Sequence, residues 1–67
     1  MNELAKIVRS ARGNVSRRVF CKFLDISYER LYRLEKGYKV SQDTLKKVAL
    51  YFGLSIKEVL DAYHKQV

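Results

Sequence analysis

Residues 16–37 read SRRVFCKFLDISYERLYRLEKG, and this stretch decides the fold. Ser16 and Ser27 each precede a run with apolar residues at helical spacing, and serine is a preferred residue at the N-terminal cap of a helix. Only two residues separate the runs, the first of them Asp25, and Gly37 follows the second run as a stop signal. The stretch therefore predicts two short helices joined by a tight turn.

The rest of the sequence predicts three more helices and no sheet. A first helix over about residues 2–12 is ended by Gly13, and Ser41 opens a fourth helix that is closed by Gly53. The run SIKE at residues 55–58 matches a capping box, in which the serine and the glutamate each satisfy a free backbone N–H of a fifth helix. Proline is absent and alternating β-rich runs are hard to find, so the fold class is all-α, a compact bundle of five short helices.

Helical spacing also predicts which side chains face the core. The chain is short enough that residues 1–67 form a single domain with one core. The inward positions of the five predicted helices, in order, are Leu4, Ile7, Val8 and Ala11; Val19, Phe20, Phe23 and Leu24; Leu31 and Leu34; Leu45, Val48, Ala49 and Phe52; and Ile56, Val59, Leu60 and Tyr63.

The charge balance indicates an anionic partner. Lys and Arg number 14 against 7 Asp and Glu, which gives a formal net charge of +7. Nucleic acid is the natural partner for such a surface, although charge alone would equally serve solubility. No stretch approaches the roughly 20 apolar residues of a membrane span, and the N-terminus lacks a signal peptide's apolar run, so we expect a cytoplasmic protein without a membrane partner.

Chemistry-bearing residues are few, which predicts no enzyme, no metal and no cofactor. The one cysteine, Cys21, cannot form an internal disulfide or complete a metal site, and we expect it to be a packed thiol and not a redox sensor. The one histidine, His64, is not grouped with other metal-ligating or catalytic residue types in any recognisable motif of the sequence. No nucleophile with a base, paired carboxylates or glycine-rich phosphate loop is present, so no small-molecule substrate is expected.

Two short capped helices joined by a tight turn, over about residues 16–36, have the layout of a helix-turn-helix, whose second helix is sized for the DNA major groove. Across about residues 4–60 the chain also resembles the lambda and 434 repressor and Cro family (XRE-type) of five-helix DNA-binding domains. The residues that carry the resemblance are Val15-Ser16, Phe20-Cys21, Ile26-Ser27, Leu31, Leu34-Glu35-Lys36-Gly37, Leu45-Lys46-Lys47-Val48-Ala49 and Phe52-Gly53-Leu54-Ser55.

The chain departs from the family pattern at several places. Asp25 stands where the turn usually has glycine, and aspartate tolerates positive φ better than most residues. Val40 replaces a frequent proline, and Arg17 replaces a frequent glutamine that contacts the DNA backbone. The connection after the first helix is one residue longer than is common, which leaves open whether Arg9 reaches Glu35, as the family's helix-one arginine often does.

The exposed face of the third predicted helix is the candidate base-reading surface. Arg33 can pair bidentately with guanine and Glu29 can accept a hydrogen bond from cytosine, although the two side chains are also spaced for an ordinary i,i+4 ion pair. Tyrosines on this face are expected to reach phosphates or thymine methyl groups. The predicted base-reading residues, partly by resemblance, are Ser27, Tyr28, Glu29, Tyr32 and Arg33.

Cations around this helix predict contacts with DNA phosphates. Two arginines, Arg17 and Arg18, fall in the first turn of the second helix, where the helix dipole disfavours positive charge. A residue choice that costs local stability is expected where function demands it, and free backbone N–H groups there favour phosphate. The predicted phosphate-binding residues are Arg17, Arg18, Arg30, Lys36, Tyr38 and Lys39.

Together these features predict a sequence-specific regulator of transcription that binds double-stranded DNA, most simply a repressor on a near-palindromic operator. The family binds two half-sites as a symmetric dimer, and apolar residues outside the predicted core suggest a small homodimer interface. One alternative is an antitoxin-type protein-interaction module that also represses its own operon, and another is a nucleic-acid binder driven by charge alone. The predicted dimerisation residues are Leu50, Tyr51, Tyr63 and Val67.

Overall fold

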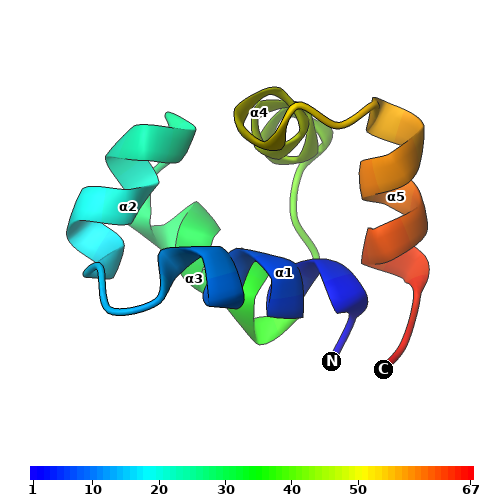
Figure 1. Ribbon diagram of the computed structural model, residues 1–67, viewed down its shortest axis with the longest axis horizontal. Helices are drawn as coiled ribbons and strands as arrows, with labels where there is room; N and C mark the ends of the chain where they lie inside the picture. The colour runs from blue at the N-terminus through cyan, green and yellow to red at the C-terminus, as the bar shows by residue number, and fades with distance from the viewer.

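The computed structural model describes residues 1–67 as five α-helices without a sheet, as the sequence predicts (Figure 1). The helices are α1 (Glu3–Arg12), α2 (Arg17–Leu24), α3 (Tyr28–Lys36), α4 (Gln42–Phe52) and α5 (Ile56–His64). The longest, α4, has 11 residues, and none has the length and apolar character that a membrane crossing requires.

Side-chain caps fix where the helices begin, and the predicted caps are confirmed. The hydroxyls of Ser16, Ser27, Ser41 and Ser55 each accept a hydrogen bond from the backbone N–H three residues later. At α5 the Glu58 carboxylate also accepts a hydrogen bond from the Ser55 N–H, which completes the capping box and lowers the pKa of Glu58.

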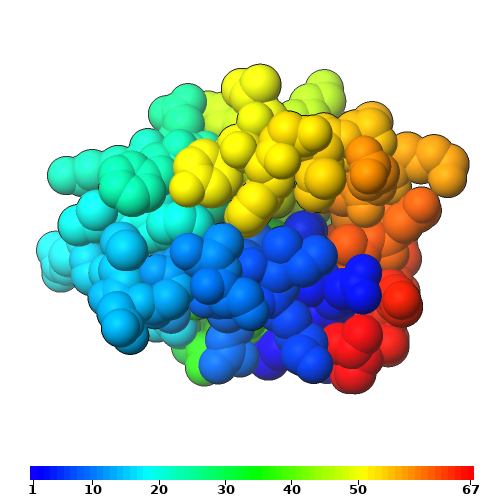
Figure 2. Space-filling model, in the orientation of Figure 1, coloured from blue at the N-terminus to red at the C-terminus, as the bar shows by residue number.

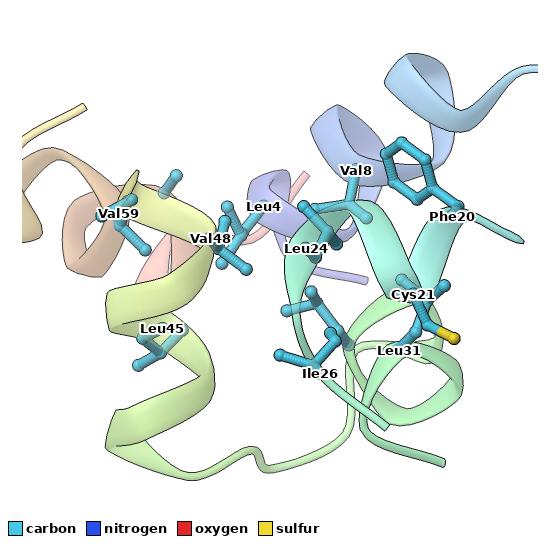
Figure 3. Packing of buried hydrophobic residues seen from close by; sticks show 13 residues of the cluster. Leu4, Val8, Phe20, Cys21, Leu24, Ile26, Leu31, Leu45, Val48 and Val59 are labelled. Carbon is cyan, nitrogen blue, oxygen red and sulfur yellow. The ribbon is translucent and has the colours of Figure 1, made fainter. Parts of the chain in front are cut away.

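One core joins all five helices. In Figure 1, α1 crosses in front of α3 and packs on it, while α2, α4 and α5 surround this pair. Figure 3 shows Leu4 and Val8 of α1 among apolar side chains from the other helices, including Leu24 and Val48. Cys21 lies in the same cluster and is 7% exposed, as expected of a packed thiol.

Four side chains predicted to be buried are exposed instead. Val19 and Phe23 of α2 are 45% and 55% exposed, because the buried side of this helix is formed by Phe20, Cys21 and Leu24. Adjacent residues on a helix differ by about 100° in direction, so the true inner face is rotated by one residue from the predicted one. The same rotation exposes Ala11 of α1, whereas Ala5 is buried.

The fourth misplaced side chain is Ile56, which is 39% exposed. It is the first residue of α5, and burial on this helix is centred one turn further on, at Val59 and Ala62. The end of a helix receives fewer neighbours than its middle, so the predicted apolar stripe is correct in direction but starts too early.

The turn between α2 and α3 is made by a left-handed residue that is not glycine. Asp25 has φ 59° and ψ 44°, and its carboxylate accepts a hydrogen bond of 2.9 Å from Lys47 Nζ. This hydrogen bond lowers the pKa of Asp25 below its ordinary value of 3.8. The contribution of the pair to stability is therefore present above that value and is lost as the pH falls through the lowered pKa.

We predict that Asp25→Gly makes the protein more stable, because glycine removes the strain of a Cβ at positive φ and the lost ion pair is exposed. The advantage is expected to grow between about pH 7 and about pH 3, since only the wild type loses the Asp25–Lys47 pair on acidification. Thermal unfolding at both pH values measures it, with Asp25→Asn as the control that removes the charge but keeps the Cβ. An advantage that shrinks in acid would contradict the assignment.

Candidate nucleic-acid interface

Helix α3 presents one polar face to solvent and one apolar face to the core. Leu31 and Leu34 are buried, whereas Tyr28, Glu29, Tyr32, Arg33 and Lys36 are all exposed. Four of the five residues predicted to read bases are therefore exposed on this helix, and the fifth, Ser27, is the exposed residue that caps its N-terminus.

The buried side of α3 also carries a carboxylate, which two arginines neutralise. The Glu35 side chain has no solvent exposure. Arg12 donates to it from Nε to Oε2 at 2.7 Å and from Nη2 to Oε1 at 3.0 Å, and Arg17 donates from Nε to Oε1 at 3.0 Å. This Arg12–Glu35–Arg17 triad ties α1 and α2 to α3.

The triad answers the question of which arginine of the first helix reaches Glu35: it is Arg12, not Arg9. Arg12 is the last residue of α1, and its Nη1 also donates to the Val15 carbonyl at 3.0 Å. The longer connection after α1 is thus held by the same guanidinium that neutralises Glu35. Arg9 instead lies beside the Met1 sulfur, 3.6 Å away.

Arg17 has a structural role that the sequence did not predict. Its hydrogen bond to Glu35 raises the pKa of the guanidinium, which also lies over the Tyr32 ring, 5.4 Å from the ring centre. The cost of a cation in the first turn of α2 is therefore offset by a buried carboxylate, and DNA is not required to explain it. Arg18 makes no ion pair and is exposed next to it. Contact of either arginine with phosphate stays a prediction.

The Glu29–Arg33 ion pair considered from the sequence is not formed. Arg33 instead donates from Nε at 3.0 Å and from Nη2 at 2.9 Å to the Lys39 carbonyl. The left-handed Gly37 ends α3 and turns the chain back beside the helix, which brings this carbonyl within reach of Arg33. Arg33 is therefore paired with a main-chain acceptor that the turn at Gly37 brings beside it, and not with the exposed Glu29 carboxylate.

Aromatic rings and cations alternate along this surface. Arg33 lies over the Tyr38 ring at 5.7 Å, and Tyr38 makes an edge contact with Tyr32 at 6.5 Å between ring centres. Lys36 lies over Tyr32 at 5.5 Å. Stacked cations of this kind lose less conformational freedom on binding than free side chains do.

The other cations predicted to contact phosphate differ in whether they already form an ion pair within the protein. Arg30 donates to Asp43 of α4 at 3.1 Å, so part of its charge is already neutralised within the protein. Lys39 makes no ion pair and lies exposed beyond α3.

The predicted dimerisation residues do not lie together. Leu50 is 84% exposed, and Tyr51 contacts Phe20 of α2 with 5.8 Å between ring centres. The hydroxyl of Tyr63, in contrast, accepts a hydrogen bond of 3.1 Å from the Val40 N–H, and Val67 pairs with Met1 at the chain ends. Tyr63 therefore supports the loop after α3 through its hydroxyl, and its place in a dimer surface stays a prediction.

Exposed apolar side chains of α2 extend the surface around Tyr51. Phe23 lies 6.0 Å from Phe20, the ring that Tyr51 also contacts, and Val19 lies one turn before Phe23. In Figure 2 the atoms of α2, in cyan to teal, adjoin the yellow atoms at the end of α4. We call Val19, Phe23, Leu50 and Tyr51 the α2–α4 patch.

Comparison with known proteins gives one match. A family model described as "Helix-turn-helix" matches residues 6–59, which is most of the chain and includes α2, α3 and α4 entirely. No curated protein and no solved structure matches the chain.

Proposed function

The chain belongs to the helix-turn-helix family of the Cro and C1 repressor type, a family of DNA-binding regulators, and from this premise we propose that it is a sequence-specific repressor of transcription. In this proposal α3 lies in the major groove of double-stranded DNA, and two copies of the chain bind the two halves of a near-palindromic operator.

The observation that supports base reading most strongly is the exposed face of α3. Tyr28 and Arg33 are both exposed to solvent on a helix whose other side is fixed in the core and tied down through Glu35. A base-reading element must be rigid and must carry side chains that can donate to guanine or pack on thymine methyl groups. The α3 face satisfies both conditions.

Cations beside and beyond α3 support phosphate binding. Arg17 and Arg18 stand at the start of α2, with Arg17 against Tyr32 and Glu35 of α3, while Lys36 and Lys39 stand at the C-terminal end of α3 and in the loop that follows. Phosphate contacts set the register of such a domain on DNA but carry no sequence information. Specificity in this proposal therefore rests on the α3 face alone.

The α2–α4 patch supports a homodimer. Four exposed apolar side chains are fewer than the roughly 20 residues that each partner contributes to a stable interface of standard size. We therefore propose that the two copies associate weakly in solution and that the operator completes the dimer by holding them side by side.

The experiment that tests the proposal is selection of bound sequences from random double-stranded DNA at physiological salt. An enriched inverted repeat is the expected result, since it reports both base reading and a two-fold symmetric dimer. Selection without any enriched half-site would point to a binder driven by charge, and a single enriched half-site would remove the dimer. Copurification of a second protein that masks α3 would favour the antitoxin-type alternative.

We predict that Arg33→Ala weakens binding to the selected operator by about 1–3 kcal/mol, because one bidentate contact to guanine is worth that much discrimination. Binding to unrelated duplexes should change little. Arg18→Ala is the matched control, because loss of a phosphate contact should weaken all sequences alike. Titration of each variant against the operator and a scrambled duplex measures both effects. Equal losses on the two duplexes for Arg33→Ala would refute its base-reading role.

A further inference from the structure

The Arg33 guanidinium is held by the loop after α3 along one edge. Its Nε and Nη2 both donate to the Lys39 carbonyl, at 3.0 and 2.9 Å, and the Tyr38 ring lies against the guanidinium, 5.7 Å from its central carbon. A guanidinium has five N–H donors. Two of them are used by Lys39, and the outer edge, with one parallel N–H from each terminal nitrogen, stays free.

The free edge has the geometry that guanine requires. Two parallel N–H groups match the O6 and N7 acceptors that guanine presents in the major groove. An unrestrained arginine would have to lose rotamer freedom when it binds, and a restrained one has lost much of it already. The contacts with the loop therefore leave Arg33 able to read a base and lower the cost of doing so.

The loop itself is fixed on both sides of Lys39, so it can act as a support. The Tyr38 N–H donates to the Arg33 carbonyl at 2.9 Å, and the Val40 N–H donates to the Tyr63 hydroxyl of α5 at 3.1 Å. The Tyr38 ring also packs edge-on against Tyr32. The carbonyl that orients Arg33 is thus set by α3 and α5 together.

We infer that Tyr38 is a positioning residue, which sets base specificity by holding the Arg33 guanidinium with its ring and not by contacting DNA with its hydroxyl. This inference rests on the proposed function, because it concerns the base pair that Arg33 reads. It replaces the phosphate contact that the sequence suggested for Tyr38 with a role exerted through Arg33.

Two substitutions at this position separate the ring from the hydroxyl. Tyr38→Phe keeps the ring and removes the hydroxyl, and Tyr38→Leu removes both. Tyr38 is 51% exposed, so neither change opens a cavity in the core. The probes are the duplex selected by the wild-type protein and its single-base-pair variants. A parallel selection with Arg33→Ala identifies the base pair that depends on Arg33.

We expect Tyr38→Leu to reduce the preference for the Arg33-dependent base pair about three- to tenfold, the effect of releasing one restrained side chain. Preferences at other positions should be unchanged, and Tyr38→Phe should retain the wild-type preference. Equal weakening of all sequences by both variants would assign Tyr38 to phosphate and overturn the inference, as would an unchanged preference in Tyr38→Leu. If no motif is selected by the wild type, the proposed function fails. If a motif appears without any Arg33-dependent position, the base-reading role of Arg33 and the positioning role of Tyr38 fail together, while sequence-specific binding by the protein stands.

Discussion

Replacement of Glu35 by alanine is expected to destabilise the protein by about 3 kcal/mol, at the lower end of the range for breaking a buried ion pair. The carboxylate is fully buried and accepts three hydrogen bonds from two arginines. Without it, Arg12 and Arg17 lose their acceptor, and like charges remain next to each other at the junction of α1, α2 and α3. The lower end applies because the two arginines are 20% and 27% exposed and keep some contact with water.

A loss of this size matters in so small a domain. At roughly 0.05–0.15 kcal/mol per residue, the whole free energy of unfolding is on the order of 3–10 kcal/mol. Glu35→Ala should therefore lose between about a third and all of its free energy of unfolding, although Glu35 contacts no DNA in the proposed complex. Denaturant titration followed by circular dichroism measures the free energy of unfolding.

The two arginines supply matched controls for this prediction. Arg12 makes two hydrogen bonds to Glu35 and one to the Val15 carbonyl, whereas Arg17 makes one hydrogen bond to Glu35. Arg12→Met should therefore cost more stability than Arg17→Met, and less than Glu35→Ala. A loss below about 1 kcal/mol for Glu35→Ala would show that the triad contributes no more than an ordinary surface pair.

Operator affinity is expected to fall about 10³- to 10⁵-fold when monovalent salt rises from about 50 to about 200 mM, as for proteins that neutralise 6–10 phosphates. Each copy offers five cations predicted to contact phosphate, two of which are already paired with Glu35 or Asp43. Between three and five effective contacts in each of two copies give that total. Plots of log affinity against log salt provide the slope.

Single substitutions test whether the predicted cations are the ones responsible. Lys39→Ala should make the slope shallower by about 0.9 for each copy bound, because each released phosphate contact contributes that amount. Lys57 of α5 is the control, since it is paired with Asp61 and lies outside the predicted surface. A slope that Lys57→Ala reduces as much as Lys39→Ala would mean that DNA contacts a different side of the molecule.

Local sequence signals were sufficient for the helices and for the open face of α3. A serine cap accepts a hydrogen bond from a residue three positions later, and apolar residues on one helix face are three or four positions apart. Both signals therefore depend only on residues that are close together in the sequence. For this reason the predicted caps at Ser16, Ser27, Ser41 and Ser55 agree with the structure. The match of a helix-turn-helix family model to residues 6–59 confirms the resemblance that these signals supported.

Other features were decided only by how the helices approach one another. The family resemblance suggested Arg9 as a possible partner of Glu35. In the tertiary structure the ion pairs of Glu35 are with Arg12 and Arg17. Helix packing likewise leaves Phe23 exposed to solvent. The hydrogen-bond acceptor of Arg33 is the carbonyl of Lys39, six residues later, and not the carboxylate of Glu29. Apolar periodicity in the sequence shows that a helix has an inner face. The exact rotation of the helix about its own axis depends on packing between distant segments of the chain, and so does the choice of partner for each long side chain.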